Sequence, residues 1–92
     1  MPKAIAVHPG AVLTDELTER GITPATLAAH IRELRKTINE ICRGRRDIRA
    51  EMAVKLSLAL GASPQFWLNL QRNWELHQVD QKSLARIKPI AT

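Results

Sequence analysis

The stretch that most constrains the fold is residues 23 to 46, TPATLAAHIRELRKTINEICRGRR. It begins with Thr23-Pro24, where threonine can cap the free N–H groups of a helix and proline presets the first helical residue. It ends near Gly44, which can take the left-handed conformation that stops a helix. Apolar residues keep nearly helical spacing throughout. Local rules therefore allow either two short helices, the first ending near Ile31, or one continuous helix over 24 to 43.

Positive charge is concentrated in the same part of the chain. The net charge of the 92 residues is +5. Between residues 32 and 49, seven basic residues stand against three acidic ones, which leaves an excess of four positive charges there. The basic residues are Arg32, Arg35, Lys36, Arg43, Arg45, Arg46 and Arg49. Such a concentration favours a polyanionic partner more strongly than the total charge does.

Three further helices are predicted from apolar spacing and from residues that begin and end helices. They are expected at about 10 to 20, from about Ala50 to Leu60, and from Ser63-Pro64 to about Leu76. The first follows His8-Pro9-Gly10, and glycines stop the first two. A last, weak helix is predicted over 80 to 88, ended by Pro89.

Composition favours one domain of packed helices. The hydrophobic content of 45% is enough to fill one core. The only aromatic residues are Phe66, Trp67 and Trp74, so the core must consist mainly of aliphatic side chains. No apolar run approaches the roughly 18 residues that span a bilayer, and the N-terminus does not resemble a signal peptide. We therefore expect a cytoplasmic protein that does not contact membranes.

Catalytic and metal-binding chemistry finds no support in the residue pattern. The single cysteine, Cys42, can form no intramolecular disulfide, and three scattered histidines give no metal-ligand spacing. No nucleophile or glycine-rich phosphate loop accompanies the acidic residues of the first predicted helix. We predict no cofactor, no metal and no enzymatic activity.

Four segments together are typical of one known family. They are HPGAVLTDEL at 8 to 17, RKTINEICRGRRDI at 35 to 48, MAVKLSLALGASPQFWLNLQ at 52 to 71, and Trp74. In this order they resemble the HigA/VapI antitoxins, small members of the Xre/Cro-repressor-like helix-turn-helix family. The resemblance implies an all-α, five-helix lambda-repressor-like domain over 8 to 78, and it favours a turn at Arg32 to Leu34. It leaves a loose N-terminal arm over 1 to 7 and a C-terminal extension over 79 to 92 that is a candidate for dimerisation.

The resemblance also implies a function. Members of this family form homodimers, bind a palindromic operator in their own promoter, and neutralise a RelE/HigB-like toxin that cleaves mRNA. The chain is then predicted to be the DNA-binding antitoxin of a type II toxin-antitoxin system. Two alternatives remain open: a toxin-binding scaffold with weakened or lost DNA binding, and a stand-alone Xre-type regulator without a toxin.

Individual roles follow from the same resemblance. The recognition helix should begin near Leu34, with Ile38, Ile41 and Cys42 holding it to the core. Base readout is assigned to Arg35, Lys36, Thr37 and Asn39, and phosphate contact to Thr23, Arg43, Arg45 and Arg46. Arginine can read guanine and asparagine can read adenine, each through two hydrogen bonds. Helical spacing makes Trp67, Leu70 and Trp74 most simply core residues. They are also the dimer-interface candidates, because a small domain rarely encloses two tryptophans completely.

The turn departs from the family pattern, which usually reads Gly-hydrophobic-Ser. Here it reads Arg32-Glu33-Leu34. A left-handed backbone at Arg32 would cost about 1 kcal/mol. Glu33 would place negative charge near the DNA, and Leu34 cannot cap the following helix as serine would. Arg49 likewise stands where relatives often have a threonine cap.

Overall fold

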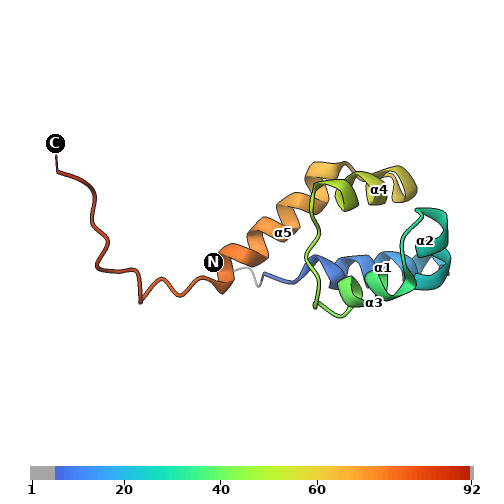
Figure 1. The fold of residues 1–92 in the computed structure, drawn as a ribbon, viewed down its shortest axis with the longest axis horizontal. Helices are drawn as coiled ribbons and strands as arrows, with labels where there is room; N and C mark the ends of the chain where they lie inside the picture. The colour runs from blue at the N-terminus through green and yellow to red at the C-terminus, as the bar shows by residue number, and fades with distance from the viewer. Residues whose placement is uncertain (1–5, 92) are drawn as a thin grey trace.

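The computed structural model describes residues 6 to 91, and within that range the chain forms five α-helices and no strand (Figure 1). The helices are α1 (Pro9–Arg20), α2 (Pro24–His30), α3 (Arg35–Cys42), α4 (Ala50–Leu60) and α5 (Pro64–Gln78). All five helices of the predicted domain are therefore confirmed, and the stretch from 24 to 43 is two helices and not one. The predicted N-terminal arm lies largely outside the described residues; its last two members, Ala6 and Val7, have no regular secondary structure.

Side chains cap three of the helices at their N-termini. The Thr23 hydroxyl accepts a hydrogen bond from the Thr26 N–H at 3.1 Å, and Ser63 does the same for Phe66 at 3.1 Å. His8 caps α1, because its Nδ1 accepts from the Gly10 N–H at 2.9 Å. The caps predicted at both Thr-Pro and Ser-Pro are thus confirmed, and α3 and α4 have no side-chain cap, as expected.

The core lies where the five helices meet. Its buried apolar side chains include Leu13, Leu17, Leu27, Ala28, Ile38, Ile41, Ile48, Ala53, Leu56 and Trp67. Helix α1 packs on α3 and α5, α2 packs on α3, and α4 packs on α5. Both isoleucines of α3 are fully buried, which confirms that they hold this helix to the core. Cys42 is partly buried and packs against the same cluster.

The turn between α2 and α3 depends on one residue with a left-handed backbone. Arg32 has φ 59°, the only positive φ outside glycine among the described residues. The Glu33 N–H donates to the Ala28 carbonyl at 2.8 Å, which satisfies one of the last carbonyls of α2. Helices α1 and α3 end with the same left-handed geometry, but on Gly21 and Gly44. The turn predicted from the family pattern is confirmed, and it is built on an arginine.

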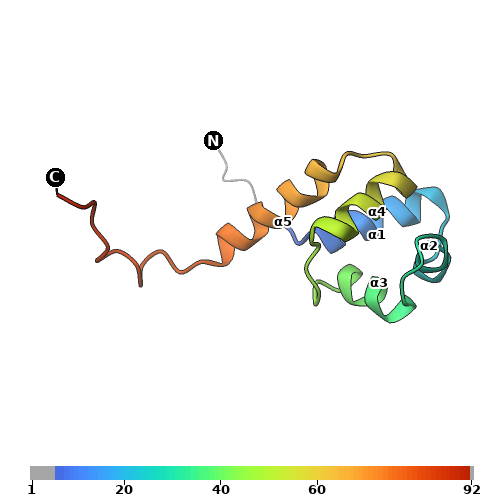
Figure 2. The same cartoon turned by 45° about the horizontal axis from the view of Figure 1, so that its top comes forward.

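Helix α5 runs out of the bundle into an extended C-terminal segment (Figures 1 and 2). Residues 79 to 91 are exposed throughout. The helix predicted over 80 to 88 is wrong: the segment has only short turns, such as the bond from the Ile87 N–H to the Leu84 carbonyl at 3.0 Å. No face of this segment is buried, and so short a helix is marginal without tertiary packing.

Replacing Arg32 with glycine tests the strain at the turn. We expect Arg32→Gly to raise the free energy of unfolding by about 0.5 to 1 kcal/mol, because relief of left-handed strain exceeds the entropy cost of glycine. Thermal or urea unfolding measures the change. The matched control is Ala29→Gly at an exposed, ordinary helical position, which should lower stability by about 0.5 to 1 kcal/mol. If both variants lost the same free energy of unfolding, the backbone of Arg32 would not be strained.

Candidate nucleic-acid interface

Close backbone packing against α1 sets the position of α3. Gly10 lies against the C-terminal end of α3, where an added Cβ would overlap the Ile41 carbonyl. The His8 ring lies beside Gly44, the residue that ends the turn after α3. The His-Pro-Gly segment, which the sequence marks only as a helix start, therefore also places α1 directly on α3.

The outer face of α3 presents polar and basic side chains. Arg35 and Lys36 are exposed, and Asn39 is half-buried. A shallow hollow of about 360 Å³ is lined by Arg35, Lys36, Asn39, Glu40, Arg43 and Arg45. Three of the four predicted base readers and two of the predicted phosphate contacts thus share one surface. We call these five residues, Arg35, Lys36, Asn39, Arg43 and Arg45, the basic face.

The remaining predicted contacts lie elsewhere or are already engaged. Thr37 and Arg46 line a neighbouring hollow of about 350 Å³, whose lining includes both acidic and basic side chains. Arg46 donates to the Glu40 carboxylate through Nε at 3.1 Å and Nη2 at 2.9 Å. A phosphate at Arg46 would have to compete with this carboxylate. The Thr23 hydroxyl is used as the cap of α2.

The acidic residue in the turn is compensated. Glu33 forms an ion pair with the Lys55 ammonium group of α4, and both side chains are partly buried. The negative charge that Glu33 was expected to place near the DNA is therefore balanced by Lys55. Lys55 was missed because its partner lies 22 residues away in the sequence, and neither residue carries a local signal for the pairing. Leu34 gives no cap, as predicted, and is 71% exposed.

The predicted dimer-interface residues divide into two groups. Trp67 is 1% exposed and belongs to the core of the protomer, so it offers almost no surface to a partner. Leu70 and Trp74 are half-buried. The Trp74 ring meets the His8 ring edge to face, with 4.8 Å between the ring centroids. These two residues stay candidates.

A second residue that sequence reasoning missed is Gln71, which is 4% exposed. Its Oε1 accepts a hydrogen bond from the Ile48 N–H at 2.8 Å, in the connection between α3 and α4. The available signal was its position four residues after Trp67, which places both side chains on the inner face of α5.

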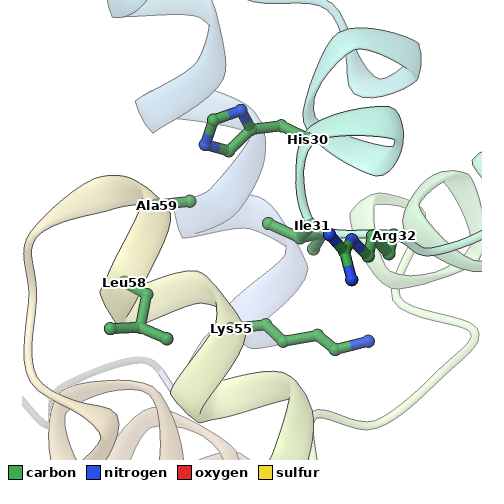
Figure 3. A pocket seen from close by; sticks show the side chains of 6 residues that line it. All are labelled: His30, Ile31, Arg32, Lys55, Leu58 and Ala59. Carbon is green, nitrogen blue, oxygen red and sulfur yellow. The ribbon is translucent and has the colours of Figure 1, made fainter.

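A separate pocket lies on the other side of the turn, between the C-terminal end of α2 and α4 (Figure 3). Its volume is about 220 Å³, and it is lined by His30, Ile31, Arg32, Lys55, Leu58 and Ala59. In Figure 3 the Lys55 and Arg32 side chains extend along one side of it, and Leu58 stands on the other. None of the predicted DNA contacts lines this pocket.

Helices α2 and α3 are short and are joined by a left-handed turn. The apolar face of α3 is buried in the core, and its basic face is open. This arrangement defines a helix-turn-helix protein. A family model described as helix-turn-helix matches residues 14–67. The chain belongs to this family, and within it to the HigA/VapI antitoxins, as its relatives show. This family groups DNA-binding regulators and not enzymes.

Three relatives illustrate the likeness. Virulence-associated protein I of Dichelobacter nodosus is 36% identical over 90 residues, which cover 95% of this chain and 83% of the relative. Antitoxin HigA-1 of Vibrio cholerae is 34% identical over 88 residues, covering 91% and 83%. The solved structure of Pseudomonas aeruginosa antitoxin HigA with the higBA promoter has a TM-score of 0.88 and 37% identity, and the match covers 95% of this chain and all of that one. This likeness confirms the predicted five-helix fold. No helix among residues 6 to 91 has the length and apolar character to cross a membrane.

The contact between α1 and α3 can be tested at Gly10. We expect Gly10→Ala to destabilise the fold by about 1 to 3 kcal/mol, because the added methyl group must push α1 away from the end of α3. Urea unfolding measures the loss. Gly21→Ala is the control: its Cβ would meet nothing within 4 Å, so it should lose only the roughly 1 kcal/mol of left-handed strain. A loss at Gly10 no larger than at Gly21 would contradict the close contact.

Proposed function

We propose that this chain is the antitoxin of a type II toxin-antitoxin system, which acts as a dimeric repressor of its own operon and neutralises a RelE/HigB-like mRNA-cleaving toxin. The observation that carries the DNA-binding part is the basic face of α3, which is exposed and open while the opposite face is buried. Similarity to an antitoxin solved with its promoter supports the same interpretation.

In this proposal α3 enters the major groove. Arg35, Lys36, Thr37 and Asn39 reach base edges, and Arg43 and Arg45 contact the phosphates beside the groove. Two copies of α3, roughly 34 Å apart in a dimer, read successive major grooves on one side of a palindromic operator. The left-handed turn supports retained DNA binding over the scaffold alternative, because the atypical residues still separate α2 from α3.

Dimerisation is assigned to the outer end of α5 and to the C-terminal extension. Leu70 and Trp74 lie on α5, and the extension exposes Ile87 by 74% and Ile90 by 90%. Residues 79 to 91 are exposed against the rest of the described chain, and exposed apolar side chains on such a segment favour association with another chain. A second protomer or the toxin would bury them.

Operator binding tests the first half of the proposal. The probe is a DNA duplex from the region upstream of the chain's own reading frame, which we expect to bind two protomers with strong salt dependence. Arg35→Ala should cost about 1 to 3 kcal/mol on this duplex and relax the preference for the base it reads. Arg45→Ala should weaken binding to all duplexes alike and lower the slope of affinity against salt by about 0.9.

Both variants are measured by electrophoretic shift and by titration at several salt concentrations. Glu19→Gln, on the exposed side of α1, serves as a control that should leave base preference unchanged. If Arg35→Ala and Arg45→Ala bound every duplex as tightly as the parent, the basic face would not be the DNA-binding surface.

The toxin half is tested with the neighbouring reading frame. We expect a small basic RelE-like protein encoded beside this chain to co-purify with it and to lose its mRNA-cleaving activity in the complex. Cleavage of a defined mRNA, with and without the antitoxin, is the measurement. A neighbouring protein that neither binds the chain nor cleaves RNA would favour the stand-alone regulator instead.

A further inference from the structure

The connection between α3 and α4 holds Arg43 and Arg45, which the proposed function assigns to phosphate contact. Two further arginines, Arg46 and Arg49, lie in its second half. Its first half is tied to α3, because the Arg45 N–H donates to the Glu40 carbonyl at 2.8 Å. Its second half has no regular secondary structure, so something outside the connection must hold it.

Gln71 of α5 provides that support. The Ile48 side chain is 1% exposed, and the Ile48 N–H donates to the Gln71 Oε1 at 2.8 Å inside the protein. The two residues are 23 positions apart in the sequence. A buried backbone N–H that loses its only acceptor is costly, so this hydrogen bond fixes the connection at Ile48.

A second contact from α5 reaches the other end of the connection. Trp74 lies three residues after Gln71 and meets the His8 ring. His8 in turn lies beside Gly44, and its Nε2 is 3.7 Å from an Asp47 carboxylate oxygen. Gln71 and Trp74 therefore hold the connection at Ile48 and, through His8, near Gly44 and Asp47.

We propose that Gln71 is a positioning residue for DNA binding: it anchors the α3–α4 connection at Ile48 so that the arginines around it face the phosphates in a fixed arrangement. The inference rests on the proposed function. Gln71 touches no DNA itself and acts through Ile48, while the Trp74–His8 contact supports the same connection from its other end. Without the anchor the phosphate contacts loosen and the base readers of α3 stay in place, because Ile38 and Ile41 hold that helix independently.

The chemistry of the side chain gives a sharp pair of variants. The Gln71 Nε2 is buried and has no hydrogen-bond partner among the described residues, so the acceptor oxygen is the part in use. Gln71→Met keeps the length of the side chain and removes the acceptor. Gln71→Glu keeps an acceptor for the Ile48 N–H, but it replaces the unused donor with a second oxygen and adds a negative charge when ionised. Gln65→Met makes the same change at an exposed position of the same helix.

The experiment measures binding to the upstream duplex and to an unrelated duplex of equal length across a salt series, after thermal unfolding has shown each variant to be folded. For Gln71→Met we expect weaker binding to both duplexes by the same factor, with the salt slope reduced by about 0.9 for each phosphate that is no longer neutralised. The ratio between the two duplexes should stay that of the parent. Gln65→Met should not change the slope, and Gln71→Glu, whose added negative charge would itself weaken DNA binding, is compared by hydrogen exchange alone.

Amide hydrogen exchange tests the anchor without DNA. In the parent and in Gln71→Glu, the Ile48 amide should exchange much more slowly than the exposed amides of residues 79 to 91. In Gln71→Met, the Ile48 amide should exchange nearly as fast as those exposed amides, while the Ile38 amide stays protected. Rapid exchange at Ile48 in the parent would overturn the inference. This measurement needs only the parent, so it holds even if Gln71→Met fails to fold.

The outcomes separate the inference from the proposed function. A parent chain that binds no duplex overturns the proposed function and the positioning role with it, whatever the exchange data show. A parent that binds the operator, with a folded Gln71→Met variant of equal affinity and salt slope, overturns the positioning role alone. A changed ratio between the two duplexes would also overturn it, because Gln71 would then act on base readout.

Discussion

The left-handed backbone at Arg32 is the constraint on which the arrangement of the helices depends. Without it, the apolar spacing over 24 to 43 would continue as one helix, and α3 could not fold back onto the core. The strain costs about 1 kcal/mol. Each of Leu27, Ile38 and Ile41, buried at the sides of this turn, contributes about 1.5 to 3 kcal/mol by leaving water. Burial therefore outweighs strain, and an arginine is tolerated where glycine would be unstrained.

The distribution of charge follows from a few ion pairs. Glu33 is paired with Lys55, and Glu40 is paired with Arg46. Solvent still reaches both pairs, and ion pairs that are screened by solvent add little to stability, typically less than about 1 kcal/mol. Their effect is on the surface potential: two carboxylates in the basic stretch are compensated. Arg35, Lys36, Arg43 and Arg45 take part in no ion pair within residues 6 to 91, which leaves the basic face positively charged.

Helix α5 links the core to the proposed DNA contacts. Its first turn is capped by Ser63, Trp67 fills the core, and Gln71 holds the α3–α4 connection. The following residues leave the bundle and expose apolar side chains along the C-terminal segment. The family segment SPQFWLNLQ therefore combines a cap, a core residue and an anchor within nine positions. Ser63 caps the helix because it directly precedes α5, and Trp67 and Gln71 reach the interior because they lie on the inner face of α5.

Features that depend on neighbours along the chain could be predicted from the residues alone. Caps such as Thr23 and Ser63, the glycine stops, the apolar stripes and the basic character of α3 are local. They predicted α1, α4 and α5, both ends of the stretch from 24 to 43, and the concentration of positive charge there. Periodicity could not locate the turn at Arg32, because a left-handed arginine has no local signal, and the family pattern was needed to place it there. That Glu33 meets Lys55 and that Gln71 holds Ile48 became visible only in the folded chain, because these contacts join residues that the packing of separate helices brings together.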